Sequence, residues 1–332
     1  MSAEKKAEAL TPERLDAAAE RLAEVRASVA KTVIGLETVV EQALAVILSG
    51  GHGLLVGAPG LAKTRLVHTL AIVTGLDDKR VQFTPDLMPA DILGSEVLDQ
   101  AADGSRQFRF VPGPVFCRLL MADEINRASP RTQAALLQAM QEGHVTVAGQ
   151  RHDLPRPFHV LATQNPIEQE GTYPLPEAQL DRFLMQIDVP YPSREEERAI
   201  LLATTGVGED QSHTVLSPEE IMDLQHVVRA MPVGEKVTDA ILDLLERARP
   251  DRSSDAQVRE AVAWGPGPRA GQALMLAVRA RALLQGRLAP STEDVAALAG
   301  PVLKHRMAIS FAARADGLSV DALVARLASE AA

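Results

Sequence analysis

The sequence predicts an α/β fold, in which a mostly parallel sheet is covered by helices on both faces and is followed by an all-helical region. Short apolar runs alternate with helical patterns between residues 31 and about 190, which is typical of a parallel sheet. Beyond about residue 191, apolar residues recur at spacings of three and four, as in amphipathic helices. We therefore expect an N-terminal packing helix in 1–30, an αβα domain in 31–190 and an all-α domain in 191–332.

The expected packing helix begins at Thr11-Pro12, because proline is favoured in the first helical turn. An apolar stripe at helical spacing follows, formed by Leu15, Leu22, Val25 and Val29.

Five apolar runs are the expected strands of the sheet. They cover residues 53–56, 81–84, 115–122, 159–163 and 185–189. Two further segments, 93–114 and 143–154, interrupt the alternation and read as inserted β-hairpins. The first contains Asp103-Gly104, a strong tight-turn signal.

Helix starts are expected at three places in the second half of the chain. Ser193, Ser217 and Ser291 each precede an acidic residue by three positions. This spacing allows the serine and the acid to cap the first turn of a helix reciprocally.

Composition limits the classes of function. The chain has 332 residues and a formal net charge of −10, which disfavours nucleic acid as a partner because its phosphates select basic surfaces. The one cysteine, Cys117, lies in an apolar run and fits a reducing compartment. No apolar run approaches the length of a membrane span, and no secretory signal follows Met1. We expect a cytoplasmic protein without membrane insertion.

A glycine-rich loop directly after the first apolar run has the residues that a nucleoside triphosphate site needs. It consists of Gly57, Ala58, Pro59, Gly60, Leu61, Ala62, Lys63 and Thr64. Backbone N–H groups of such a loop point at phosphates, while the lysine reaches the β- and γ-phosphates and the threonine hydroxyl holds Mg²⁺. Ala62 stands where a second glycine is usual, so a plain strand-to-helix turn is the alternative.

Asp123 and Glu124 end the apolar run 115–122. Carboxylates at the end of a buried strand suit metal-dependent phosphate chemistry: Asp123 would anchor Mg²⁺ through water or Thr64, and Glu124 would act as general base toward water. The alternative is a strand end whose acidic residues only face water, which the upstream Lys63-Thr64 pair disfavours.

The order of these motifs resembles that of the AAA+ ATPases, and within them the MoxR family. The matching stretches are 32–35, 57–64, 82–92, 110–114, 123–128, 162–166, 175–183 and 265–270. The resemblance implies an AAA+ αβα P-loop domain with two β-hairpin insertions and a smaller all-α lid. Members of this family carry alanine before the loop lysine, so Ala62 agrees with it.

The resemblance also implies roles for several further residues. Asn165 would be the sensor 1 residue that contacts the γ-phosphate or the attacking water. Arg182 would be an arginine finger given to a neighbouring subunit, and Arg269 the sensor 2 arginine of the lid. The residues alone leave simpler readings open: a turn at Asn165-Pro166, an ion pair of Arg182 with Asp181 or Glu177, and a solvated Arg269. Additional nucleotide contacts are implied for Val33, Ile34 and Arg65.

As a function, the resemblance implies Mg²⁺-dependent hydrolysis of ATP in a homo-oligomeric, hexameric ring that remodels or activates partner proteins, with a von Willebrand factor A domain protein as partner. One alternative is the I-type ATPase subunit of magnesium chelatase, which shares the two hairpin insertions. Another is a nucleotide-dependent scaffold without turnover, against which the presence of Glu124 and Asn165 argues. The protein client is left open.

Overall fold

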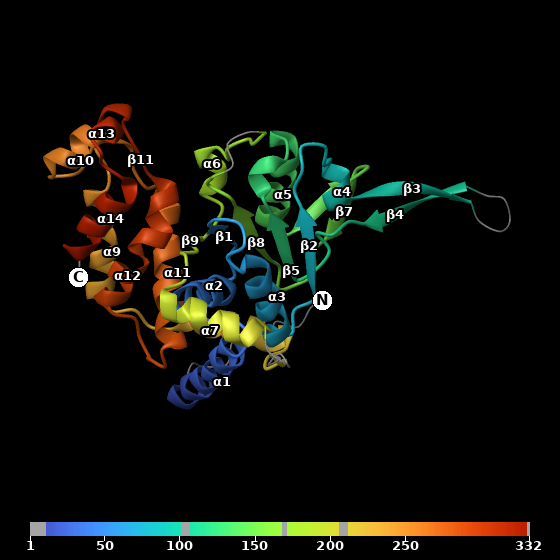
Figure 1. The fold of residues 1–332 in the computed structure, drawn as a ribbon, viewed down its shortest axis with the longest axis horizontal. Coiled ribbons are helices and arrows are strands. Elements are labelled where there is room, and N and C mark those ends of the chain that lie inside the picture. Colours follow the sequence, from blue (N-terminus) through green and yellow to red (C-terminus); the bar gives the residue numbers. More distant parts are fainter. Residues whose placement is uncertain (1–10, 101–105, 168–170, 206–211, 331–332) are drawn as a thin grey trace.

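A five-stranded parallel sheet forms the centre of the first domain (Figure 1). The structure, a computed structural model, describes residues 11–100, 106–167, 171–205 and 212–330. The strands lie in the order β2-β5-β8-β1-β9. Their bounds are β1 Gly53–Val56, β2 Asp78–Gln82, β5 Leu119–Asp123, β8 His159–Gln164 and β9 Met185–Asp188. Because all neighbouring pairs are parallel, the carboxyl ends of the strands meet at one edge.

Two strands begin at other residues than their apolar runs predict. β2 starts at Asp78 rather than residue 81, because it is the edge strand and exposes most of its side chains. β5 starts at Leu119 rather than residue 115, although Val115 and Cys117 are fully buried. These two residues belong to a turn, so burial there does not mean a strand.

Helices cover both faces of the sheet. Alternate strand residues point to opposite faces, so Leu55 and Leu119 pack with α2 (Glu37–Leu48) and α3 (Lys63–Thr74). Leu54 and Leu120 pack instead with α4 (Pro89–Leu93) and α5 (Pro130–Glu142). The N-terminal helix α1 (Pro12–Ala30) is capped by Thr11 and lies against α2, α3 and α11.

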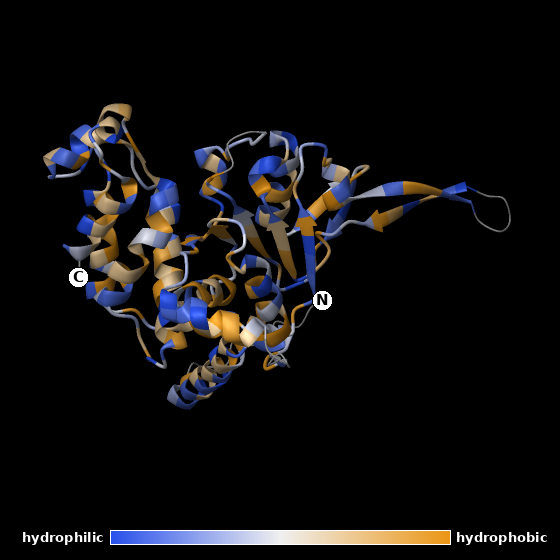
Figure 2. Cartoon of the chain, viewed as in Figure 1, coloured by the Kyte–Doolittle hydropathy of each residue, from blue (hydrophilic) through white to orange (hydrophobic). Residues whose placement is uncertain are grey.

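Both predicted β-hairpins are present. The first pairs β3 (Gly94–Gln100) with β4 (Arg106–Pro112) and projects far from the domain, with a partly hydrophobic surface (Figures 1 and 2). Its expected Asp103-Gly104 turn lies outside the described residues. The second pairs β6 (His144–Val147) with β7 (Gln150–Asp153) through Ala148 and Gly149, which have φ values of 47° and 81°.

The lid is helical, as expected. After α6 (Glu177–Leu180), the helices of the C-terminal part of the chain are α7 (Arg194–Thr205), α8 (Pro218–Ala230), α9 (Glu235–Arg247), α10 (Ala256–Ala261), α11 (Pro268–Leu284), α12 (Thr292–Leu303), α13 (Phe311–Ala315) and α14 (Val320–Ser329). All three expected serine caps form, at Ser193, Ser217 and Ser291. The lid also contains a short antiparallel ribbon of β10 (Val262–Trp264) and β11 (Ala308–Ile309), which is too short to produce a periodic pattern. The predicted boundaries at residues 30 and 190 stay predictions.

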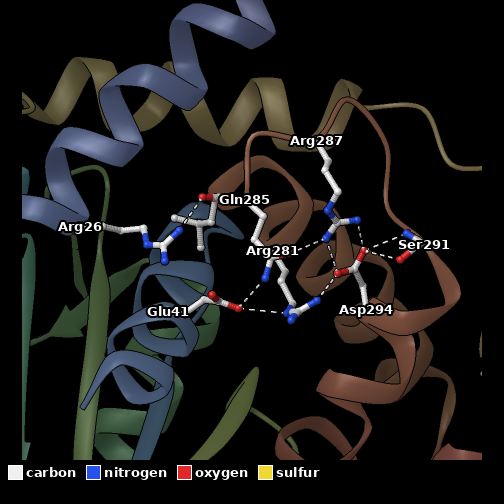
Figure 3. A network of polar contacts seen from close by, with 8 residues as sticks. Arg26, Glu41, Arg281, Gln285, Arg287, Ser291 and Asp294 are labelled. Atoms are coloured by element: carbon white, nitrogen blue, oxygen red, sulfur yellow. Dashed lines mark hydrogen bonds and ion pairs between the residues drawn. The ribbon is translucent and has the colours of Figure 1, made fainter. Parts of the chain in front are cut away.

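A charged network joins the lid to the first domain (Figure 3). Glu41 on α2 accepts a 3.0 Å hydrogen bond from Arg281 on α11. Arg281 and Arg287 both pair with Asp294, which is fully buried and also accepts from the Ser291 amide at 2.8 Å. Within the described residues, no helix is long and apolar enough to cross a membrane.

Candidate functional site

The loop between β1 and α3 lies at the carboxyl edge of the sheet. At Gly57 a Cβ would lie 2.8 Å from the Val189 carbonyl oxygen, so only glycine allows the loop to pass this close to β9. Gly60 and Ala62 have φ values of 81° and 54°. For Ala62 this left-handed conformation costs about 1–2 kcal/mol, a local strain directly before the amino end of α3. The free N–H groups of this helix end favour an anion.

Lys63 is folded back onto its own loop. Its ammonium donates hydrogen bonds of 2.6 Å to the Gly57 carbonyl and 2.9 Å to the Ala58 carbonyl. Burial lowers the pKa of Lys63, and the charges of Asp123 and Glu124 oppose this lowering. The structure therefore brings the loop lysine and the acidic pair into one electrostatic environment.

Asp123 is buried at the end of β5, and both of its carboxylate oxygens are engaged. Oδ1 accepts a 2.6 Å hydrogen bond from the Thr163 hydroxyl. Oδ2 accepts two hydrogen bonds from Arg80, from Nε at 3.1 Å and from Nη2 at 2.5 Å. Neither Arg80 nor Thr163 is predicted from the sequence as a site residue. The Arg80 contact depends on the register of β2 against β5, for which the sequence carries no motif.

Glu124 leaves β5 in a left-handed conformation, with φ of 55°. Its amide donates a 2.8 Å hydrogen bond to Thr163 Oγ1, so Thr163 fixes both acidic residues. The carboxylate Oε2 accepts from the Gln82 side-chain amide at 2.6 Å and from Arg127 Nη1 at 2.9 Å. Glu124 therefore lies on the β2 side of the site.

Asp123 and Thr64 suit a magnesium ion by their chemistry. Mg²⁺ prefers oxygen ligands and usually keeps several waters while binding one or two protein groups and substrate phosphates. Thr64 is exposed, and its hydroxyl has no hydrogen-bond partner among the described residues. Those residues also contain no cluster of three or more histidine, cysteine or acidic side chains that could hold a metal without such help.

Asn165 directly follows β8, the strand between β5 and β1. It is buried, and its side-chain oxygen accepts a 3.1 Å hydrogen bond from the Ile167 amide. This is the turn expected from the Asn-Pro pair. The side-chain NH₂ group of Asn165 is left for another acceptor. The structure is therefore compatible both with a turn residue and with a residue that contacts the γ-phosphate or the attacking water.

A cavity of about 480 Å³ is lined by Gly35 and several residues after it, which directly follow Val33 and Ile34 in the sequence. Its walls come from α2, the segment after β9, α7 and α12, and include Gly35, Asp188, Tyr191, Glu196 and Lys304. The segment after β9 also passes the phosphate loop, because the Val189 amide bonds the Val56 carbonyl. The cavity is therefore close to the loop. Arg65 is partly buried in the first turn of α3.

Arg182 and Arg269 lie together in a different cavity, of about 230 Å³. Arg182 donates a 2.7 Å hydrogen bond to the Leu137 carbonyl, whereas Arg269 lies 3.6 Å from Asp181. Asp181 also pairs with the buried Arg306 at 2.7 Å. In the described part of the chain, no residue of the loop 57–64 lines this cavity. The structure thus places both arginines along one cavity that the phosphate loop does not line.

Comparisons with known proteins agree with this architecture. Residues 52–185 match the family model of the ATPase family associated with various cellular activities (AAA), and residues 254–327 match that of the AAA lid domain. Chaperone MoxR1 of Mycobacterium tuberculosis is 42% identical over 300 residues, which cover 90% of this chain and 78% of that protein. Protein MoxR of Paracoccus denitrificans is 32% identical, with 87% and 89% covered.

The chain belongs to the MoxR family of AAA+ ATPases. A solved structure of a candidate ATPase from Cytophaga hutchinsonii is similar to this MoxR-family chain with a TM-score of 0.87 and 35% identity, over 95% of this chain and 96% of that one. The protein is thus a chaperone-like AAA+ ATPase of MoxR type, and nucleotide binding follows from the family. The roles of the individual site residues stay predictions.

Proposed function

We propose that this MoxR-family protein hydrolyses ATP to ADP and phosphate at the site built from the loop 57–64, Asp123, Glu124 and Asn165. The observation that carries the proposal is that the loop after β1, the acidic residues at the end of β5 and Asn165 after β8 meet at the carboxyl edge of one parallel sheet. A phosphate-binding lysine next to two carboxylates is what a metal-dependent phosphoryl transfer requires.

Each residue has a role that its position supports. Lys63 exchanges its carbonyl partners for phosphate oxygens, and the loop amides bind the same phosphates. Thr64 and Asp123 hold Mg²⁺, which neutralises charge on the phosphates when bound. Glu124 accepts the proton of the attacking water, and the Asn165 amide orients that water or the γ-phosphate.

The cavity of about 480 Å³ is our candidate for the base and ribose. Val189, between the lining residues Asp188 and Pro190, passes close to Gly57 of the phosphate loop, and Val33 and Ile34 precede one of the cavity walls. A volume of this order falls within the usual range for small-ligand sites, about 300–1,000 Å³.

The position of Arg182 and Arg269 along one cavity supports assembly. Because these arginines lie together and apart from their own loop, we infer that they serve a nucleotide bound to a second copy. A head-to-tail contact of this kind closes into a ring when its rotation allows, and we propose a hexameric one. Arginine donors can neutralise charge that develops on the γ-phosphoryl oxygens.

The work of the ring is proposed to be the remodelling or activation of partner proteins, including one with a von Willebrand factor A domain, in the cytoplasm. The name of the Mycobacterium relative, a chaperone, supports action on other proteins.

One experiment tests turnover and assembly together. ATP hydrolysis per subunit is measured over a range of protein concentrations, with light scattering in the presence and absence of a slowly hydrolysed ATP analogue. We expect activity per subunit to rise with concentration and then level off, and the analogue to produce a larger species. Full activity of a monomer at nanomolar concentration would refute the ring, whereas an absence of Mg²⁺-dependent turnover at every concentration would refute the ATPase.

A further inference from the structure

The ion pair between Arg80 and Asp123 links an edge-strand arginine to the carboxylate that we assign to Mg²⁺. Arg80 lies on β2, which runs parallel to β5 with Gln82 opposite Asp123. Two N–H groups of one guanidinium therefore reach a single oxygen, Oδ2, at 3.1 and 2.5 Å. Such charge-assisted hydrogen bonds are among the stronger polar contacts in proteins.

This contact and a metal ion compete for the same carboxylate. Oδ1 already accepts from the Thr163 hydroxyl at 2.6 Å, whereas Oδ2 has no other hydrogen-bond donor among the described residues once Arg80 is absent. A guanidinium on Oδ2 blocks those lone pairs sterically. Its positive charge also repels a dication that approaches within a few ångströms.

The two partners differ in their freedom to move. The Asp123 side chain is 12% exposed, whereas the Arg80 side chain is 53% exposed. Arg80 can therefore turn into water while Asp123 keeps its place beside Thr163. Arg80 Nη2 also donates to Gln82 Oε1 at 3.2 Å, and Gln82 in turn holds Glu124. Departure of Arg80 would thus loosen the side chain that fixes the proposed base.

We propose that Arg80 is an internal competitor of Mg²⁺ for Asp123, so that binding of the metal with its nucleotide requires the Arg80 guanidinium to leave this carboxylate. The inference rests on the proposed function, because it takes Asp123 as a metal ligand. Arg80 is in this view a positioning residue that keeps the site closed to the metal until a nucleotide arrives. Arg80 therefore lowers the affinity of the site for Mg²⁺ below the value that its oxygen ligands alone would give.

The test measures how Mg²⁺ strengthens nucleotide binding in Arg80→Gln. Affinity for fluorescent N-methylanthraniloyl-ADP is determined in EDTA and then over a Mg²⁺ series, without any turnover. The matched control is Arg109→Gln, since Arg109 is also a strand arginine paired with one aspartate, Asp99 at 2.7 Å, but on the projecting hairpin. The quantity compared is the Mg²⁺ concentration that gives half of the full increase in nucleotide affinity. We expect this concentration to fall about 5- to 30-fold in Arg80→Gln and to stay unchanged in the control.

Other results overturn the proposal in distinguishable ways. An unchanged Mg²⁺ requirement means that Arg80 does not compete, and a higher requirement means that Arg80 helps to orient Asp123 for the metal. Weaker nucleotide binding already in EDTA, with an unchanged Mg²⁺ requirement, assigns Arg80 to the phosphates instead.

A second variant, Arg80→Lys, keeps the positive charge but cannot donate the two guanidinium hydrogen bonds to Oδ2. The proposal therefore places its Mg²⁺ requirement between those of Arg80→Gln and the native protein. A protein that binds no nucleotide under any condition refutes the proposed function itself.

Discussion

The Glu124 carboxylate accepts a 2.6 Å hydrogen bond from the Gln82 side chain at the end of the neighbouring strand. Arg127 donates to the same oxygen at 2.9 Å. Oε2 of the proposed base is therefore occupied in this conformation, and Oε1 is the oxygen left for a water molecule. The contact also explains how a residue in a left-handed conformation keeps a fixed side-chain direction.

The first prediction concerns this carboxylate. Glu124→Gln keeps the size of the side chain and loses its basicity, so we expect nucleotide affinity to stay within a few-fold and hydrolysis to fall about 10²- to 10⁴-fold. Phosphate release and nucleotide binding are measured on the same preparation. The control is Glu142→Gln, at the far end of α5. Native turnover in Glu124→Gln would remove this residue from the mechanism.

The second prediction concerns the loop lysine. Lys63→Ala removes the counter-ion of the phosphates, so we expect affinity for ATP to fall about 10- to 100-fold, in line with the strength of hydrogen bonds to charged groups. Equilibrium binding of a fluorescent nucleotide measures this loss. Lys236→Ala, an exposed lysine of α9, should bind as the native protein does. Equal affinities in the two variants would contradict a phosphate role for Lys63.

Much of this site follows from the sequence because its parts are local. The loop 57–64 and the acidic pair each follow an apolar run, and parallel strands place their carboxyl ends at one edge. The Arg80–Asp123 pair could not be predicted in this way. Residues 78–80 are polar because β2 is an edge strand, so no apolar pattern marks the strand or its register. The meeting of Arg182 with Arg269 likewise depends on how the lid packs on the first domain.

The third prediction concerns the network of Figure 3. Although burial raises the pKa of Asp294, hydrogen bonds from Arg287, Ser291 and Arg281 outweigh it, and the net effect is a lowered pKa. Asp294→Asn removes the charge partner of Arg287 and leaves Arg281 with Glu41 alone, so we expect a loss of about 2–4 kcal/mol in the free energy of unfolding. Glu293→Gln, an exposed acid in the same helical turn, should cost less than about 1 kcal/mol. Urea unfolding at pH 7 compares them, and equal losses would show that Asp294 acts only through the helix end.

The fourth prediction concerns two histidines at the amino ends of β1 and β8, the partly buried His52 and the buried His159. Burial lowers the pKa of His52 to about 3 and that of His159 to about 4. Both rings are neutral in the fold: the His52 Nδ1 atom accepts from the Val160 amide at 3.0 Å, and Gln225 lies 3.1 Å from His159 Nε2. In the unfolded chain they take up protons near their ordinary pKa of about 6.5.

Stability contributed by these neutral rings is fully present above about pH 6.5 and is lost as the pH falls toward 4, by about 1.4 kcal/mol per pH unit for each ring. Urea unfolding at pH 7, 6 and 5 measures this slope. His159→Gln should reduce the slope by about one ring's share, whatever its effect on stability at pH 7. His226→Gln, an exposed histidine of α8, is the control. A slope unchanged by His159→Gln would mean that the His159 ring takes up no proton on unfolding over this pH range, which would refute the prediction for this residue.

The last prediction uses the cavity in which Arg182 meets Arg269. Arg182→Ala should leave ATP affinity within a few-fold and lower hydrolysis by about 10³- to 10⁵-fold, the range for arginine fingers supplied by another subunit.

A mixing experiment separates action of Arg182 on a neighbouring subunit from action within its own chain. Subunits with Glu124→Gln have an inactive site but donate an intact arginine, whereas subunits with Arg182→Ala have an intact site and donate none. In a mixed ring some interfaces pair an intact site with an intact arginine, so two inactive proteins should together recover measurable turnover. If light scattering shows mixed assemblies and no activity returns, Arg182 acts within its own subunit or only supports α5 through the Leu137 carbonyl.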